Sequence, residues 1–302
     1  MFKKILYPTA FDNFYQDVLG CITNLKEVGT EEIILLHVIY ASHLPQVHEG
    51  YIPKLADALR RLLDAKMNEA ASIVENAGLT VKRRIELGVP HREILKVADE
   101  ENVSLIVCGR EHKGAFGEIF IGSTTDKIIR YGTIPVYVPK CPIGPDVASQ
   151  ADAFCRDPFR RILYPTDWSE CARNTLHYLK GIKDASVGEI VVAHVMDEKA
   201  MKLQPEEKFR EFERVDREKL QQVKEELEKE GFMVKTLLRV GNPRGELIRI
   251  ARYENISLIV MGAHGKGRME GILWGSVSRN TAEYSESPIL LIKGKACDPQ
   301  QT

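Results

Sequence analysis

Near the C-terminus, glycines and serines recur at a spacing that suits the binding of a phosphate group. Residues 261–265 read Met-Gly-Ala-His-Gly, and after nine more residues 275–278 read Gly-Ser-Val-Ser, which gives the pattern G-x-x-G-x9-G-S. Glycines let a ligand approach the backbone, and a helix that begins at Ser276 would present free N–H groups and its positive dipole end. The hydroxyls of Ser276 and Ser278 add donors. The pattern predicts a polyphosphate site, although such glycines also occur in loops that only turn the chain.

A carboxylate follows the strand expected at residues 162–164. Asp167 comes directly after Pro165 and Thr166, and in an open parallel sheet the loops after the strands meet at one edge. In other nucleotide-binding folds an acidic residue at that edge accepts hydrogen bonds from ribose hydroxyls. Ser169 follows shortly afterwards, so Asp167 is also interpretable as a helix N-cap or as its neighbour.

Other polar residues are less informative. His37 and His194 lie within apolar strands, where we expect histidines with local hydrogen-bond partners. His264 fills a variable position of the glycine pattern, and its role stays open. The cysteines lie far apart with no C-x-x-C pair, so we expect reduced, mostly structural thiols. They are Cys21, Cys108, Cys141, Cys155, Cys171 and Cys297.

An internal repeat organises the chain. Residues 2–9, FKKILYPT, return as FRRILYPT at 159–166, an offset of 159 − 2 = 157. Residues 101–109, ENVSLIVCG, return as ENISLIVMG at 254–262, an offset of 254 − 101 = 153. The second copy is therefore four residues shorter, between its second strand and the end of its third.

The junction between the copies is typical of a linker, because two prolines flank a glycine and a polar stretch follows. We therefore expect a domain at residues 1–140, a linker at 141–158, a second domain at 159–294 and a tail at 295–302. Amphipathic stretches alternate with short apolar runs, which in the first copy cover residues 5–7, 33–39, 81–87, 105–108 and 134–138. This rhythm predicts two tandem, doubly wound α/β domains, each a parallel sheet with helices on both faces.

Residues 204–230 form a long, charged, amphipathic stretch. Its apolar stripe covers only about three heptads, which is too short to predict a coiled coil. We expect this helix to pack on its own sheet, and a partner-binding coiled coil is the alternative. The stripe consists of Phe209, Phe212, Leu220, Val223 and Leu227.

Composition limits the classes of function. Lys and Arg number 42 against 43 Asp and Glu, a formal charge of −1, so the basic excess of nucleic-acid-binding proteins is absent. The longest apolar runs, such as residues 33–36 and 258–261, are far short of the roughly 20 residues that span a bilayer. The N-terminal residues contain no apolar signal segment. We expect a cytoplasmic protein that has neither nucleic acid nor membrane as a partner.

Three motifs together resemble the universal stress protein family in its tandem form. They are residues 164–167 (YPTD), residues 193–197 (AHVMD) and the glycine pattern, and the similarity covers nearly all of the chain outside the linker and tail. The resemblance implies five-stranded sheets in the order 3-2-1-4-5 that bind ATP, AMP or a related adenine nucleotide, with Mg²⁺ as a companion of ATP. It implies that residues 134–138 and 289–292 pair the halves as a pseudo-dimer. A homodimer of chains and an unidentified protein partner stay open.

By matching positions, the resemblance places Asp167 at the ribose, the backbone of Val195 at the adenine and the glycine pattern at the phosphates. It assigns no catalytic or metal-binding residue. The nucleotide-binding residues that we expect are Pro165, Thr166, Asp167, Val195, Met261, Gly262, His264, Gly265, Gly275, Ser276, Val277 and Ser278.

The first copy departs from these motifs. Ala10 stands where the second copy has Asp167, so the ribose acceptor is absent. Residues 110–112 read Arg-Glu-His where the second copy reads Ala-His-Gly, which adds bulk and a carboxylate that repels phosphates. We therefore expect one nucleotide per chain, bound by the second half. The alternative is a different phosphorylated ligand in the first half, held by Arg110, Lys113 and Ser123.

Three functions are compatible with this pattern. A stress-response or regulatory protein needs nucleotide-binding residues only, and it is the function we expect. A slow ATPase or nucleotidyl transferase is the alternative, but it requires a positioned base and usually a metal carboxylate, and the sequence has no Walker lysine, H-E-x-x-H or G-x-S-x-G. Asp197 could approach a metal ion, yet its place after the second strand indicates the adenine side. A purely structural module leaves the intact second pattern unexplained.

Overall fold

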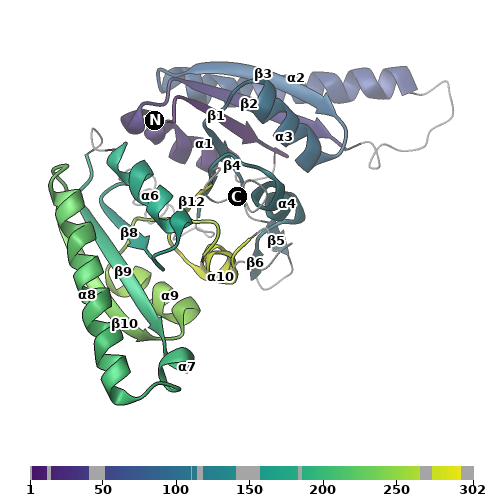
Figure 1. The fold of residues 1–302 in the computed structure, drawn as a ribbon. Coiled ribbons are helices and arrows are strands. Elements are labelled where there is room, and N and C mark those ends of the chain that lie inside the picture. The colour runs from purple at the N-terminus through teal and green to yellow at the C-terminus, as the bar shows by residue number, and fades with distance from the viewer. Residues whose placement is uncertain are drawn as a thin grey trace.

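The computed structural model of the chain describes residues 2–11, 15–40, 52–109, 111–113, 118–140, 157–182, 186–265 and 274–293. Figure 1 shows two α/β halves, the first coloured purple to blue and the second teal to yellow. Of the predicted linker, only residues 157 and 158 are described, and the predicted tail lies outside the described residues. The predicted domain boundaries therefore stay a prediction.

The first half alternates strands with helices as the repeat predicts. Its main strands are β1 (Lys4–Pro8), β2 (Glu32–Ile39), β3 (Thr80–Leu87), β4 (Leu105–Val107) and β7 (Val136–Val138). Its helices are α1 (Tyr15–Thr23), the short η1 (Asn24–Val28), α2 (Ile52–Asn76), α3 (Pro90–Glu100) and α4 (Ser123–Tyr131). A two-stranded hairpin, β5 (Glu111–Lys113) with β6 (Glu118–Phe120), was not predicted.

The second half repeats this order. Its strands are β8 (Arg161–Pro165), β9 (Glu189–Asp197), β10 (Val234–Gly241), β11 (Leu258–Gly262) and β12 (Ile289–Ile292). Its helices are α6 (Glu170–Lys180), α7 (Glu198–Met201), α8 (Glu206–Glu228), α9 (Pro243–Tyr253) and α10 (Ser276–Tyr284). The predicted strand at 289–292 therefore has the bounds of β12.

The two halves share one ten-stranded sheet, in the order β10-β9-β8-β11-β12-β7-β4-β1-β2-β3. Within each half all neighbouring strands are parallel and follow the order 3-2-1-4-5. The halves meet where β12 pairs antiparallel with β7, so that Leu290 lies opposite Tyr137. The predicted α/β fold, its strand order and the pairing of the last strands are confirmed.

Apolar side chains cover both faces of the sheet, because successive residues of a strand point to opposite sides. Ile5 belongs to a core that also contains Met67 of α2 and Leu220 of α8. Leu6 belongs to the opposite core, with Val97 of α3 and Ala282 of α10. Strands buried on both faces explain why their sequences read as continuous apolar runs.

Buried lysines tie the two halves together. Lys140 follows β7 and donates from Nζ to the carbonyl of Ala282 in α10, and Lys293 follows β12 and donates to the carbonyl of Ile129 in α4. Both lysines are buried, and they occupy equivalent places in the repeat, since 293 − 140 = 153. The two contacts are therefore reciprocal and relate the halves as a pseudo-dimer.

The structure confirms in part that helix α8 packs on its own sheet. Leu220 and Leu227 are buried in the core of the sheet, as expected for a core helix. Phe212, nearer the N-terminus of α8, is instead 40% exposed and lines a pocket that is described below.

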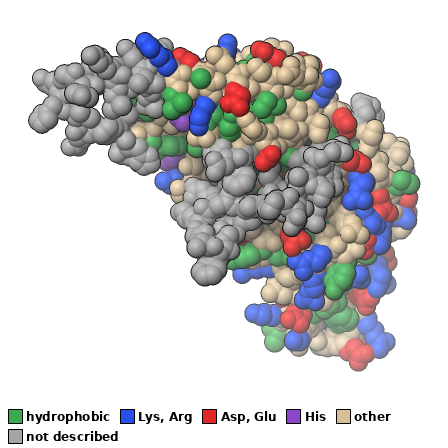
Figure 2. All heavy atoms as spheres, turned by 180° about the vertical axis from the view of Figure 1, so that it is seen from behind, with side chains coloured by type: hydrophobic (Ala, Val, Ile, Leu, Met, Phe, Trp, Pro, Cys, Tyr) green, Lys and Arg blue, Asp and Glu red, His purple; other side chains and the backbone are tan. Residues whose placement is uncertain are grey.

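On the face of the molecule drawn in Figure 2, basic and acidic side chains are interspersed over the second half. Within the described ranges, every helix is too short or too polar to cross a bilayer.

The prediction of reduced thiols is wrong for two cysteines. Cys21 and Cys171 are disulfide-bonded in the structure. Cysteines far apart in sequence meet only through the fold, so spacing gave no sign of pairing. Cys108 is a free, buried thiol, and burial raises its pKa to about 12, although a hydrogen bond with Thr125 acts in the opposite direction.

Candidate functional site

A pocket of about 780 Å³ lies at the carboxyl edge of the sheet in the second half. This volume is within the range of small-molecule sites. The ends of β8, β9 and β11 and the start of α10 form its floor, and α7, α8 and α9 contribute walls. The pocket brings together every residue that the sequence predicted for nucleotide binding: Pro165, Thr166, Asp167, Val195, Met261, Gly262, His264, Gly265, Gly275, Ser276, Val277 and Ser278.

Two hydrogen bonds fix the start of α10 beside the end of β11. Gly275 is the N-cap, and its N–H donates to the carbonyl of Ala263 at 2.9 Å. Ser278 is buried, and its Oγ donates to the carbonyl of Gly262 at 2.9 Å. The hydroxyl of Ser278 therefore holds the helix in place, whereas the sequence suggested a donor to a ligand. The first N–H groups of α10 and the hydroxyl of Ser276 are the donors at this end of the pocket.

The glycine pattern has a steric reason. A Cβ atom on Gly262 would lie 2.7 Å from Sγ of Cys171, and one on Gly265 would lie 2.5 Å from Oδ2 of Asp167. Both distances are shorter than real Cβ contacts, so side chains at these positions would displace their neighbours. Gly265 thus leaves room for the carboxylate of Asp167 at the glycine loop.

Asp167 is a neighbour of a helix cap, which is one of the two roles that the sequence left open. Its Oδ1 accepts a hydrogen bond from the backbone N–H of Ser169 at 3.0 Å. Ser169 is the N-cap of α6, where its Oγ accepts from the N–H of Ala172 at 3.2 Å. Oδ2 of Asp167 lies next to Gly265 at the pocket. One carboxylate oxygen positions the turn, and the other lies beside the glycine pattern.

His194 has the local partners that the sequence led us to expect, but it also lines the pocket. It is buried, and Nδ1 donates to the carbonyl of Thr166 at 2.7 Å. Asp197 is the N-cap of α7, with Oδ1 accepting from the N–H of Lys199 at 2.9 Å. In the part of the chain that the structure describes, no group of three or more acidic, His or Cys side chains could hold a metal ion.

Sequence reasoning missed the wall that α8 and α9 contribute. Five α8 residues that it did not assign to a site line the pocket, and one of them, Asp216, falls on the apolar stripe of the helix. An acidic residue on such a stripe was the available signal, and Leu63 occupies the equivalent place in the first half, since 216 − 63 = 153. The missed residues include Phe212, Val215, Asp216, Lys219, Pro243 and Leu247.

The first half carries different residues at the equivalent edge of its sheet. Ala10 is exposed and stands where the second half has Asp167. After β4 the backbone enters the β5–β6 hairpin, in which Glu111 pairs with Phe120. A Cβ on Gly109 would meet nothing within 4 Å, in contrast to Gly262. The two halves therefore differ in sequence at this edge, and Arg110 and residues 266–273 lie outside the described residues.

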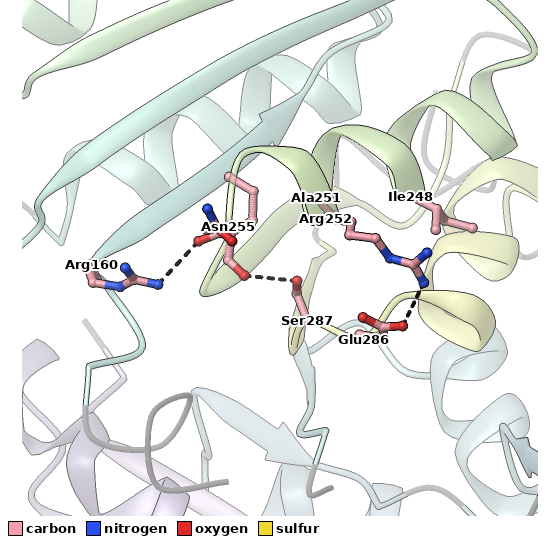
Figure 3. A pocket seen from close by; sticks show the side chains of 8 residues that line it. Arg160, Ile248, Ala251, Arg252, Asn255, Glu286 and Ser287 are labelled. Carbon is pink, nitrogen blue, oxygen red and sulfur yellow. Dashed lines mark hydrogen bonds and ion pairs between the residues drawn. The ribbon is translucent and has the colours of Figure 1, made fainter. Parts of the chain in front are cut away.

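A smaller hollow at the amino edge of the same sheet is a poor ligand site. Figure 3 shows its residues bonded to one another: Nη2 of Arg160 donates to the carbonyl of Asn255 at 3.3 Å, and Arg252 pairs with Glu286 at 2.7 Å. Ser287 donates to the carbonyl of Ile256 at 2.9 Å. Its volume of about 190 Å³ is below that of typical small-molecule pockets. The larger pocket is therefore the candidate site.

Comparisons with known proteins agree with this architecture. The universal stress protein MJ0577 of Methanocaldococcus jannaschii is 35% identical over 156 residues, which cover 45% of this chain and 96% of that protein. A universal stress protein of Mycolicibacterium smegmatis is 22% identical over 284 residues and covers 86% of this chain and 87% of its own. A crystal structure of a universal stress protein from Archaeoglobus fulgidus DSM 4304 covers 97% of both chains with a TM-score of 0.73 and 25% identity.

The sequence profile of the universal stress protein family matches twice, at residues 1–140 and 158–293. The two matches correspond to the two halves of the ten-stranded sheet. The chain therefore belongs to the universal stress protein family and carries the family's domain in tandem.

Proposed function

We propose that the second half binds one adenine nucleotide, ATP or AMP, and that the protein acts as a nucleotide-dependent regulator of a stress response. The observation that carries the proposal is the convergence of Asp167, the glycine loop and the start of α10 on one pocket. A carboxylate for ribose hydroxyls and a helix start for phosphates lie there at the same sheet edge.

The phosphate end of the pocket offers donors without a fixed cation. Gly275 leaves the mouth of α10 free of a side chain, and Ser276 follows as its first residue. The helix dipole and the N–H groups of the first turn favour an anion at this place. When ATP is the ligand, Mg²⁺ would accompany the phosphates rather than occupy a site built by this chain.

The opposite end suits a flat, apolar base. Val195 and Met196 at the end of β9 lie on the pocket, and Met201 of α7 and Phe212 of α8 stand on its wall. Apolar and aromatic surfaces with few convergent polar groups are typical of small-molecule sites. The backbone of Val195 is the group that we expect to read the edge of the adenine.

A regulator explains the pocket more completely than an enzyme. Three carboxylates around the pocket have structural partners: Asp167 bonds to the cap of α6, Asp197 caps α7, and Asp216 bonds to Trp168. A rapid ATPase requires a group that positions water and a metal carboxylate near the γ-phosphate. We expect hydrolysis to be slow or absent.

The test is to denature freshly purified protein, identify the released small molecule by mass spectrometry, and then follow product formation from added ATP. The proposal predicts an adenine nucleotide and negligible turnover. Rapid multiple turnover would replace the regulator by an enzyme. No bound nucleotide and no binding at millimolar ATP or AMP would leave a structural module.

A further inference from the structure

Trp168 follows Asp167 in an uncommon backbone conformation. Its φ is +65°, in the left-handed region that bulky residues rarely occupy. Its N–H donates to Oγ1 of Thr166 at 3.2 Å. The tight turn from Thr166 to Ser169 therefore sets the direction of the Asp167 side chain, and contacts outside the turn must hold Trp168 in this conformation.

Asp216 of α8 supplies the polar contact. Nε1 of Trp168 donates to Oδ1 of Asp216 at 2.9 Å. The ring centroid of Trp168 is 4.9 Å from that of His194, and Nζ of Lys219 is 5.5 Å from the indole ring. The side chain of Asp216 is only 14% exposed, although the residue borders the pocket.

Asp216 also acts on the other side of Asp167. Its Oδ2 lies 3.3 Å from Nε2 of His194, with which it forms an ion pair when the imidazole is protonated, and Nδ1 of His194 donates to the carbonyl of Thr166 at 2.7 Å. Asp216 of α8 thus interacts with both residues that flank Asp167. It contacts Trp168 directly and Thr166 through the imidazole of His194.

The first half has the same turn. Phe11 takes the place of Trp168, since 168 − 11 = 157, and its φ is +55°. Its N–H donates to Oγ1 of Thr9 at 3.0 Å, and its ring centroid is 5.4 Å from that of His37. His37 in turn bonds through Nδ1 to the carbonyl of Thr9 at 2.9 Å. The same turn therefore forms in the first half with an aromatic residue and a histidine and without an acid at the position of Asp216.

Three differences between the halves occur together. The half with Asp167 has Trp168 and Asp216, and the half with Ala10 has Phe11 and Leu63 at the matching positions. A phenyl ring has no N–H to donate and a leucine cannot accept a hydrogen bond. The polar contact to the turn is therefore present where the turn carries the pocket carboxylate.

We propose that Asp216 is a positioning residue of the nucleotide site: it fixes the turn on both sides of Asp167 so that the carboxylate meets the ribose hydroxyls. This inference rests on the proposed function. It assigns a role in ligand selection to α8, a helix that contributes no residue to the three motifs of the sequence.

The test compares the affinities of ATP and 2′-deoxy-ATP, measured by calorimetric titration of the full chain. Asp216→Leu reproduces the first half and should weaken ATP about tenfold, while 2′-deoxy-ATP changes by less than about threefold, so that discrimination is largely lost. Asp216→Asn keeps an acceptor for Trp168 and should remain within about threefold of the parent for both ligands. Glu218→Leu is the matched control, because it removes a surface carboxylate of α8 that pairs with Arg214.

Trp168→Phe is a second route to the same result, since the first half folds with phenylalanine at this position. It should also reduce discrimination, and it decides the matter if Asp216→Leu does not fold. Unchanged discrimination in a folded variant would overturn the role of Asp216. An equal loss for both ligands would indicate a structural role, and a loss in Asp216→Asn as large as in Asp216→Leu would indicate direct action of the charge; either overturns the inference.

A failure of the proposed function gives a different result from a failure of the role proposed for Asp216. A parent protein that binds neither nucleotide overturns the proposed function and the inference with it. A parent that binds ATP and 2′-deoxy-ATP equally well retains a nucleotide site but overturns the ribose role of Asp167, and with it the positioning role of Asp216.

Discussion

The first half of the chain and the second half have the same scaffold and different pockets. In both, a histidine of the second strand bonds to the carbonyl of a threonine after the first strand, His37 to Thr9 and His194 to Thr166. In both, a hydroxyl of the following helix donates to a glycine carbonyl at the end of the fourth strand, Thr125 in the first half at 3.0 Å and Ser278 in the second at 2.9 Å.

Only the second half has the groups that we propose for nucleotide binding. Asp167, Trp168 and Asp216 are replaced by Ala10, Phe11 and Leu63 in the first half, and Gly265 is replaced by His112. Comparing the halves distinguishes residues that maintain the fold from residues that are candidates for function, which a single domain would not allow. Hydrogen bonds found in both halves maintain the fold, and those found in one half are candidates for function.

The largest effect is expected from Gly275→Val. A Cβ at this position would lie 3.2 Å from the carbonyl oxygen of Ala263 and 3.3 Å from Oγ of Ser278, and the branched side chain would fill the mouth of α10. Nucleotide affinity should fall by about a hundredfold or more, with the fold retained by circular dichroism. Gly122→Val, at the equivalent N-cap of α4, is the control and should leave affinity unchanged. Normal binding by folded Gly275→Val would remove the phosphate assignment.

Asp167→Ala gives the second half the residue that the first half has at this position, Ala10. It removes a charged acceptor, and hydrogen bonds to charged groups contribute about 1.5–3 kcal/mol, so ATP affinity should fall roughly ten- to a hundredfold. The loss for 2′-deoxy-ATP should be smaller. Equilibrium titration measures both. If the variant binds ATP as the parent does and only melts at a lower temperature, Asp167 serves the α6 cap alone.

The pair Ser278→Ala and Thr125→Ala separates stability from binding. Each removes a buried hydroxyl that bonds to a glycine carbonyl, and each should lower the free energy of unfolding by about 1 kcal/mol, as measured by urea denaturation. Ser278→Ala should also weaken ATP severalfold, because the start of α10 loses its tie to β11. An equal effect of the two variants on ATP affinity would contradict a site confined to the second half.

The smallest effect is expected from Ala10→Asp, which restores the carboxylate in the first half. His112 still stands at the position of Gly265, and Phe11 and Leu63 still lack polar groups to hold the turn. Calorimetry should therefore give the same number of sites as in the parent. A second site of comparable affinity would show that one carboxylate is sufficient.

The sequence predicted the fold well because the repeat presents each element twice. Apolar runs located the five main strands of the first half to within a few residues, and buried strands need such runs whatever their loops do. The hairpin at residues 111–120 was missed because its first strand, Glu111–Lys113, is polar and only three residues long. The disulfide bonds of Cys21 and Cys171 depend on distances that spacing does not encode.

The sequence predicted only those residues of the candidate site that belong to the three motifs. Residues that follow strands could be placed at one edge by topology, and the structure brings them together. Side chains from the middle of α8 could not be placed, because whether a helical residue faces the core or a pocket depends on how far the helix extends beyond the sheet. The sequence pattern places Phe212 on the core stripe for this reason, and it assigns no role to Asp216.

The most direct test of the account is the stoichiometry of nucleotide binding by the full chain. Protein freed of nucleotide is titrated with ATP and with AMP in a calorimeter, and the fold is monitored in parallel by circular dichroism. We predict one high-affinity site per chain, which Asp167→Ala weakens and Ala10→Asp does not duplicate. Two equivalent sites per chain, or one site that persists unchanged in Asp167→Ala, would contradict the assignment of nucleotide binding to the second half.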